Sequence, residues 1–157
     1  MFMFNQGPAR GLGKVRFHDY RRTYAGCNLP NVGVFRKQTA VLKRMLLLAR
    51  PRKDQLGDID FLLALGQMFT LVVYGQLILE NARIYGIDDD NVDQIFEFMV
   101  RDFSAYALQL RDKPSATRMQ QWHCGRMMRR PAVDTDRFDR VWIEHVFPMR
   151  GSYTMNE

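Results

Sequence analysis

The pattern of hydrophobic and polar positions predicts a chain built from helices. Residues 61–79 contain no charged side chain, and residues 92–110 place their apolar residues at helical spacing. Intervals of three and four are typical of a helix with one buried face. That face comprises Val92, Ile95, Phe96, Met99, Val100, Phe103, Ala107 and Leu110. The two stretches predict the centre of a helical packing module.

Flanking residues predict where these two helices begin and end. Asp58 is a suitable N-cap for the first helix, and Gly86 suits the left-handed conformation in which many helices end. The second helix is then expected to begin at one of Asp88, Asp89 and Asp90, because carboxylates favour the positive end of a helix. The spacing of these acids does not fit a calcium loop, and we expect no metal site.

The first helix is apolar on all sides, which indicates burial in a protein or in a bilayer. Its uncharged run, residues 61–79, is long enough to span a membrane. However, Gln67, Thr70 and Gln76 lie inside the run, and the following helix has the single apolar stripe of a soluble neighbour. We favour a buried bundle helix and expect no membrane span, with a membrane-associated protein as the alternative.

Three further helices are predicted around this pair. Residues 32–49 repeat apolar positions at helical intervals, carry a basic opposite face and stop at Pro51. Such a face is typical of a solvated bundle helix, although it also suits a membrane surface. Ser115 is expected to cap a short helix toward Met128, and residues 136–147 are expected to form the last helix.

The predicted fold class is therefore all-α, a helical bundle of about four to five helices. The bundle is expected to occupy residues 32–147. Residues 1–31 are basic and contain six glycines and prolines, so we expect an irregular loop segment there. Residues 148–157 are expected to fray.

Charge is distributed unevenly along the chain. Residues 1–56 carry twelve Lys and Arg against two acids, residues 57–110 carry two against nine, and residues 111–157 carry nine against six. A basic first third beside an acidic middle can pair internally, so the net charge of +6 does not by itself indicate nucleic-acid binding. We favour pairing within or between chains, with an anionic ligand or nucleic acid as the alternative, and expect no nucleic-acid partner.

No residue pattern identifies a catalytic site, and the catalytic residues are left unassigned. Cys124 and a distant histidine form a thiolate–imidazole couple only if the fold joins them, and the two cysteines and three histidines lack zinc-ligand spacing. Glu80 ends the uncharged run, and we expect Arg83 to pair with it. Two cysteines make no disulfide framework and no secretory signal is apparent, so a cytoplasmic protein is expected.

Three segments of the chain resemble a known enzyme family. They are residues 3–20 (MFNQGPARGLGKVRFHDY), residues 69–80 (FTLVVYGQLILE) and residues 93–110 (DQIFEFMVRDFSAYALQL). Together they are similar to the C-terminal helical region of bacterial acyl-CoA dehydrogenase-type flavoproteins. The likeness extends over whole segments and includes no diagnostic motif.

The resemblance implies an FAD-dependent oxidoreductase of fatty acid metabolism that assembles as dimers or tetramers through its C-terminal helices. In that family a glutamate removes a proton from the acyl-CoA, and hydride passes to the flavin. This sequence contains neither the family's Gln-x-x-Gly-Gly-x-Gly cofactor segment nor its N-terminal helical and β domains. We therefore expect a C-terminal piece that is inactive alone and does not bind FAD by itself, and no catalytic residue is carried over.

Two hypotheses about function remain. In the first, the chain contributes oligomer packing to an acyl-CoA dehydrogenase-like enzyme, and Arg10, Lys14 and Arg16 contact a phosphate of FAD or coenzyme A. The glycine-rich loop that holds them matches neither the Walker pattern nor the dinucleotide-binding pattern. In the second, a non-enzymatic helical interaction module packs against a partner protein. The expected partners of the first hypothesis are other copies or the enzyme's missing domains, with acyl-CoA as the substrate of the full enzyme.

Overall fold

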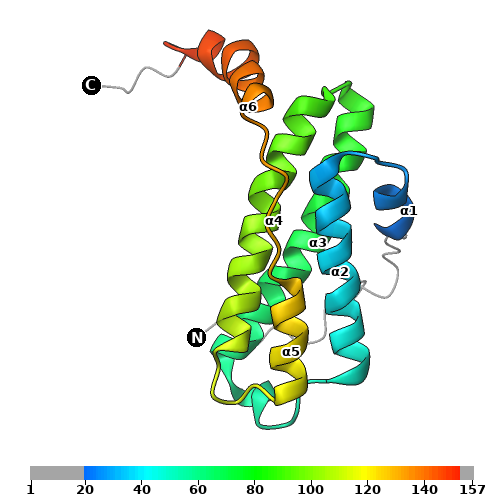
Figure 1. The fold of residues 1–157 in the computed structure, drawn as a ribbon, viewed down its shortest axis with the longest axis vertical. Coiled ribbons are helices and arrows are strands. Elements are labelled where there is room, and N and C mark those ends of the chain that lie inside the picture. Colours follow the sequence, from blue (N-terminus) through cyan, green and yellow to red (C-terminus); the bar gives the residue numbers. More distant parts are fainter. Residues whose placement is uncertain (1–19, 153–157) are drawn as a thin grey trace, which may run out of the picture.

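The computed structural model describes residues 20–152, and every regular element in that part of the chain is a helix (Figure 1). This confirms the all-α helical bundle. The predicted anion-contact residues Arg10, Lys14 and Arg16 lie outside the described residues, as does the end of the predicted tail. The elements are α1 (Tyr20–Ala25), α2 (Pro30–Leu48), η2 (Gln55–Gly57), α3 (Ile59–Tyr85), α4 (Asp89–Arg111), α5 (Arg118–Met127), α6 (Thr135–Val141), η3 (Trp142–Val146) and η4 (Phe147–Met149).

Helix α4 is the centre of the bundle. Helices α2 and α3 pack lengthwise against it, α5 packs against both α2 and α4 near one end, and α6 contacts α4 near the other end (Figure 1). The apolar stripe predicted for this helix is confirmed, because all its residues except Ile95 are buried. Edge-to-face ring contacts join Phe35 of α2 to Phe96 and Phe103 of α4, with centroids 5.4 and 5.5 Å apart. These rings form the middle of the core.

Local chemistry determines where α3 begins and ends and where α4 begins, as predicted. Asp58 Oδ1 accepts a hydrogen bond from Phe61 N at 3.0 Å, and Asp88 Oδ1 accepts one from Asn91 N at 2.8 Å. Each carboxylate satisfies an amide that the first turn of a helix leaves without an internal partner. Gly86 follows α3 with a φ of 66°, a left-handed conformation that favours glycine.

The N-cap predicted for α5 was wrong. Thr117 caps this helix in place of Ser115, because Thr117 and Gln120 form a reciprocal capping box. Ser115 has other partners: its hydroxyl donates to Asp58 Oδ2 at 3.3 Å, and its carbonyl accepts from Gln55 Nε2 at 2.7 Å. These bonds tie the end of the α4–α5 connection to the start of α3.

Helix α1 was also missed, since residues 20–25 were expected to be irregular. The Tyr24 ring is buried against Phe35 and Phe96, and its hydroxyl donates to Val72 O of α3 at 2.7 Å. Burial raises the pKa of this hydroxyl, so it remains a donor across the physiological range. Tertiary packing of one tyrosine therefore stabilises a short helix whose local sequence does not favour it.

Helix α3 is buried on one side only, although its composition predicted burial on all sides. The side toward α1 and α4 contains Phe61, Leu65, Met68, Val72 and Leu79, which are all buried. By length and composition α3 also qualifies as a membrane-crossing helix, which is weak evidence because core helices of soluble proteins pass the same test. Large apolar side chains remain exposed on its other side: Leu62, Leu63, Phe69, Val73, Tyr74, Leu77, Ile84 and Tyr85.

The close approach of α1 and α4 to α3 requires glycine at position 75. A Cβ at Gly75 would lie 2.5 Å from Tyr24 Oη and 3.2 Å from Phe96 Cε1, whereas a Cβ at Gly66, on the same helix, would meet nothing within 4 Å. We expect Gly75→Ala to lower the free energy of unfolding by about 1–3 kcal/mol through overpacking. The control Gly66→Ala should raise it by about 0.5–1 kcal/mol through helix propensity. Urea unfolding measures both, and equal effects would contradict the packing described here.

Candidate functional site

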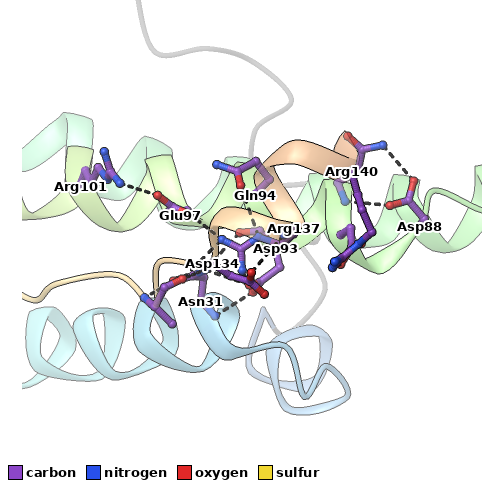
Figure 2. Close-up of polar contacts among 12 residues, drawn as sticks. Asn31, Asp88, Asp93, Gln94, Glu97, Arg101, Asp134, Arg137 and Arg140 are labelled. Atoms are coloured by element: carbon purple, nitrogen blue, oxygen red, sulfur yellow. Dashed lines mark hydrogen bonds and ion pairs between the residues drawn. The ribbon is translucent and has the colours of Figure 1, made fainter. Parts of the chain in front are cut away.

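The most densely connected polar group of the described residues surrounds Arg137, on the first turns of α6. Its side chain is inserted against α4, as Figure 2 shows, and the residue is only 4% exposed. Asp134 begins this helix, because its Oδ1 accepts a hydrogen bond from Arg137 N at 3.0 Å. The cap thus fixes the backbone that carries the buried guanidinium.

The guanidinium of Arg137 uses all three of its nitrogens. Nη1 pairs with Asp93 Oδ2, and Nη2 pairs with Glu97 Oε2 at 2.5 Å. Nε donates to Gln94 Oε1 at 3.3 Å, so three side chains of one face of α4 hold one cation. Both acids are buried, and the fork geometry of arginine suits two carboxylates better than an ammonium would.

Asp93 also stabilises the start of α2. Its Oδ1 accepts from Asn31 N at 2.8 Å, and its Oδ2 accepts from Asn31 Nδ2 at 2.9 Å. Leu29, which precedes α2, provides no side-chain cap, so Asp93 supplies from α4 the acceptor that the first turn of α2 needs. Asn31 in turn exchanges hydrogen bonds with Ala132, at 3.0 and 2.7 Å, in the segment leading to α6. One carboxylate therefore joins α2, α4 and the C-terminal segment.

The charges of this group balance. Glu97 Oε1 pairs with Arg101 one turn further along α4, so two acids face two arginines. Glu97 is only 4% exposed, because Arg137 of α6 lies against it, whereas the side chain of Arg101 is half exposed. Because each carboxylate already accepts from a cation, neither is a free base. The arrangement can hold elements together, and it has no group poised for proton transfer.

Exposed polar contacts extend this attachment toward the start of α4. Arg140 donates to both carboxylate oxygens of Asp90, at 2.6 and 3.1 Å, and His145 Nε2 lies 3.0 Å from Asp88 Oδ2. The hydrogen bond from Arg140 lowers the pKa of Asp90. In contrast, the large apolar residues Phe138 and Trp142 of the same segment are about half exposed. Polar contacts, more than apolar burial, hold this C-terminal segment.

The other candidate chemistry does not assemble. Burial raises the pKa of Cys124 to about 12, and its Sγ lies 3.9 Å from Met45 Sδ. His123 is buried, neither ring nitrogen has a hydrogen-bond partner in the described part, and burial lowers its pKa. The thiol of Cys124 is thus protonated at neutral pH, which does not fit the thiolate that a couple with a distant histidine would need.

Glu80 has partners other than the expected one. It accepts hydrogen bonds from Gln76 Nε2 at 2.8 Å and from Thr23 Oγ1 at 3.3 Å. Arg83 donates instead to Thr23 O at 3.2 Å, so both side chains attach α1 to α3 and the predicted Glu80–Arg83 pair was wrong. No group of three or more His, Cys, Asp and Glu within residues 20–152 is placed to hold a metal ion.

Sequence reasoning missed the group around Arg137. Asp93 and Glu97 lie four residues apart, which placed them on one face of the predicted helix. That spacing was a usable signal for a shared cation. The spacing could not identify Arg137 as that cation, because Arg137 lies 40 residues after Glu97. Its position depends on the path of the chain between α5 and α6.

Comparisons with known proteins leave this chain without a family assignment, since no protein-family model, curated protein or solved structure matches it.

We expect Arg137→Met to destabilise the chain far more than Arg101→Met. Removing Arg137 leaves Asp93 and Glu97 buried without their shared cation, which costs about 3–5 kcal/mol. Arg101 pairs with the same Glu97 but is half exposed, so its loss should cost about 1 kcal/mol or less. Urea unfolding followed by circular dichroism compares the two variants. Equal losses would show that the buried group is no more important than a surface pair.

Proposed function

We propose that this chain is the C-terminal helical module of an FAD-dependent acyl-CoA dehydrogenase-like enzyme and that it contributes oligomer packing through the exposed side of α3. The family part of this proposal rests on the resemblance of residues 3–20, 69–80 and 93–110. The packing part is supported by one structural observation, the uncharged apolar side of α3. The chemistry on acyl-CoA then belongs to other parts of the enzyme.

The exposed side of α3 has the properties of a surface that another helix covers. Large apolar side chains follow it from Leu62 to Tyr85, and residues 61–79 place no charge among them. Side chains from Phe69 to Leu77 line a shallow groove of about 420 Å³. Monomeric proteins rarely leave a continuous apolar patch of this extent exposed. Ridges and grooves of this kind accommodate the side chains of a neighbouring helix.

A protein partner fits this surface better than a bilayer does. On its other side, α3 buries Gln76, which donates to Glu80, and Glu80 also accepts from Thr23 of α1. A membrane-spanning helix in this arrangement would bring these polar groups and α1 into the hydrocarbon region. A second copy can cover the apolar side without moving α1 or α4, and the absence of charge avoids repulsion between identical surfaces.

The described residues also support a packing role over a catalytic one. The buried acids Asp93 and Glu97 are paired with Arg137, and Cys124 is held as a thiol. These are properties of a stable scaffold. A contact between Arg10, Lys14 and Arg16 and a phosphate of FAD or coenzyme A remains part of the proposal.

We expect the purified chain to self-associate through α3. Leu77→Glu places a charge in the proposed interface and should leave monomers at concentrations where the wild type forms dimers. Leu108→Glu is a matched control, because Leu108 of α4 is 44% exposed and Leu77 is 48% exposed. Light scattering of size-exclusion peaks over a concentration series gives the masses. A wild type that stays monomeric, or an L77E variant that still dimerises, would contradict the packing proposal.

The enzyme proposal has a separate test in flavin binding. FAD should bind when the chain is combined with the N-terminal part of the suspected enzyme, and it should not bind to this chain alone. Fluorescence titration of FAD against each component and the mixture measures this. Absence of binding in every combination would overturn the flavoprotein assignment and leave a non-enzymatic interaction module, which the exposed side of α3 supports equally.

A further inference from the structure

A groove lies between α1 and α2. Its volume is about 460 Å³, which is within the range of small-molecule sites. Its walls are mainly apolar and aromatic, with Tyr20 and Tyr24 from α1 and Leu47 from α2. None of its residues belongs to the group around Arg137 or to the exposed side of α3.

Cations from α2 border this groove. Arg36, Lys43 and Arg44 line it together with Arg21 of α1, and none of the described residues that line it is an aspartate or a glutamate. None of the three side chains from α2 has an ion pair or hydrogen bond with another residue of the part that the structure describes. Elsewhere in that part Arg101, Arg137 and Arg140 are paired with acids. The charges of Arg36, Lys43 and Arg44 therefore have no acidic partner among the described residues.

The spacing along α2 places the charges around a small residue. Arg36, Ala40, Lys43 and Leu47 follow one another at intervals of four, three and four, so they share one face of the helix. Ala40 is exposed and lines the groove one turn from each cation. Its methyl group leaves room between them, whereas a larger residue would fill that space.

We propose that this groove binds a small organic anion with an apolar body. The carboxylate, phosphate or sulfonate group of such a ligand would pair with Arg36, Lys43 and Arg44, because guanidinium and ammonium groups bind these anions. Its hydrocarbon or ring portion would contact Tyr20, Tyr24 and Leu47. Charge complementarity and the size of the groove favour this class over a macromolecule. The proposal is independent of the family resemblance and of the packing of α3.

Decyl compounds that differ only in the head group test the proposal on the full chain. Decanoate and decyl phosphate should bind, as measured by isothermal titration calorimetry. Decyltrimethylammonium should not bind, and decanol should bind at least tenfold more weakly than the anions. The comparison of decanoate with decyl phosphate distinguishes a carboxylate ligand from a phosphate ligand. Equal binding of all four would mean adsorption to apolar surface and would overturn the proposal.

Variants of α2 locate the site. Arg36→Glu with Lys43→Glu should weaken anion binding at least tenfold, and Ala40→Trp should abolish it by filling the groove. Lys37→Glu is the matched control, since Lys37 is exposed on the same helix but does not line the groove. Leu108→Glu should leave binding unchanged because Leu108 is exposed on α4 and does not line the groove. Circular dichroism confirms that each variant folds, and if the tryptophan variant does not, the double charge reversal decides the question.

Two results would overturn the assignment of the site. Anion binding that is unaffected by the charge reversal would place the ligand elsewhere on the chain. Binding of a single-stranded oligonucleotide that is lost in the same variants, with no binding of the decyl anions, would make the basic face of α2 a nucleic-acid surface instead.

Discussion

The fold depends on how α4 accommodates two carboxylates in the interior. Asp93 and Glu97 lie beside the apolar stripe of this helix, and burial of a charge is tolerated only with hydrogen-bonding partners. Arg137 and Asn31 supply those partners. As a consequence, the start of α2, the segment before α6 and α6 itself are all positioned by one side of α4, while the adjacent apolar stripe packs on the aromatic core.

The polar attachment around Arg137 and the apolar side of α3 make different contributions to the molecule. The buried polar groups around Arg137 have their partners within the chain, so they contribute to stability and determine the path of the C-terminal segment. The apolar side of α3 is not covered by the residues that the structure describes, since its large apolar side chains remain exposed. This contrast between a paired polar group and an exposed apolar face is the physical basis of the proposal that the chain is a packing module.

Sequence reasoning succeeded where the determinants are local. Asp58, Gly86 and the stripe of α4 act within one or two turns, so capping rules and periodicity predicted them. It failed where distant residues decide the outcome. Tyr24 stabilises α1 only because α2 and α4 provide Phe35 and Phe96, and Arg137 pairs with acids that lie 40 and 44 residues before it. The composition of α3 predicted burial on all sides, but it could not reveal that the described residues cover only one side of this helix.

The most direct test of the central claim compares the exposed side of α3 in two states by hydroxyl-radical footprinting. The purified chain is labelled at a dilution where it is monomeric, and the endogenous assembly is labelled in lysate of the native host. We expect Phe69, Tyr74 and Tyr85 to be oxidised rapidly in the monomer and protected in the assembly, whereas Trp122 of α5, which is also exposed, reacts equally in both. Equal oxidation of the α3 residues in the two states would show that no partner covers this surface.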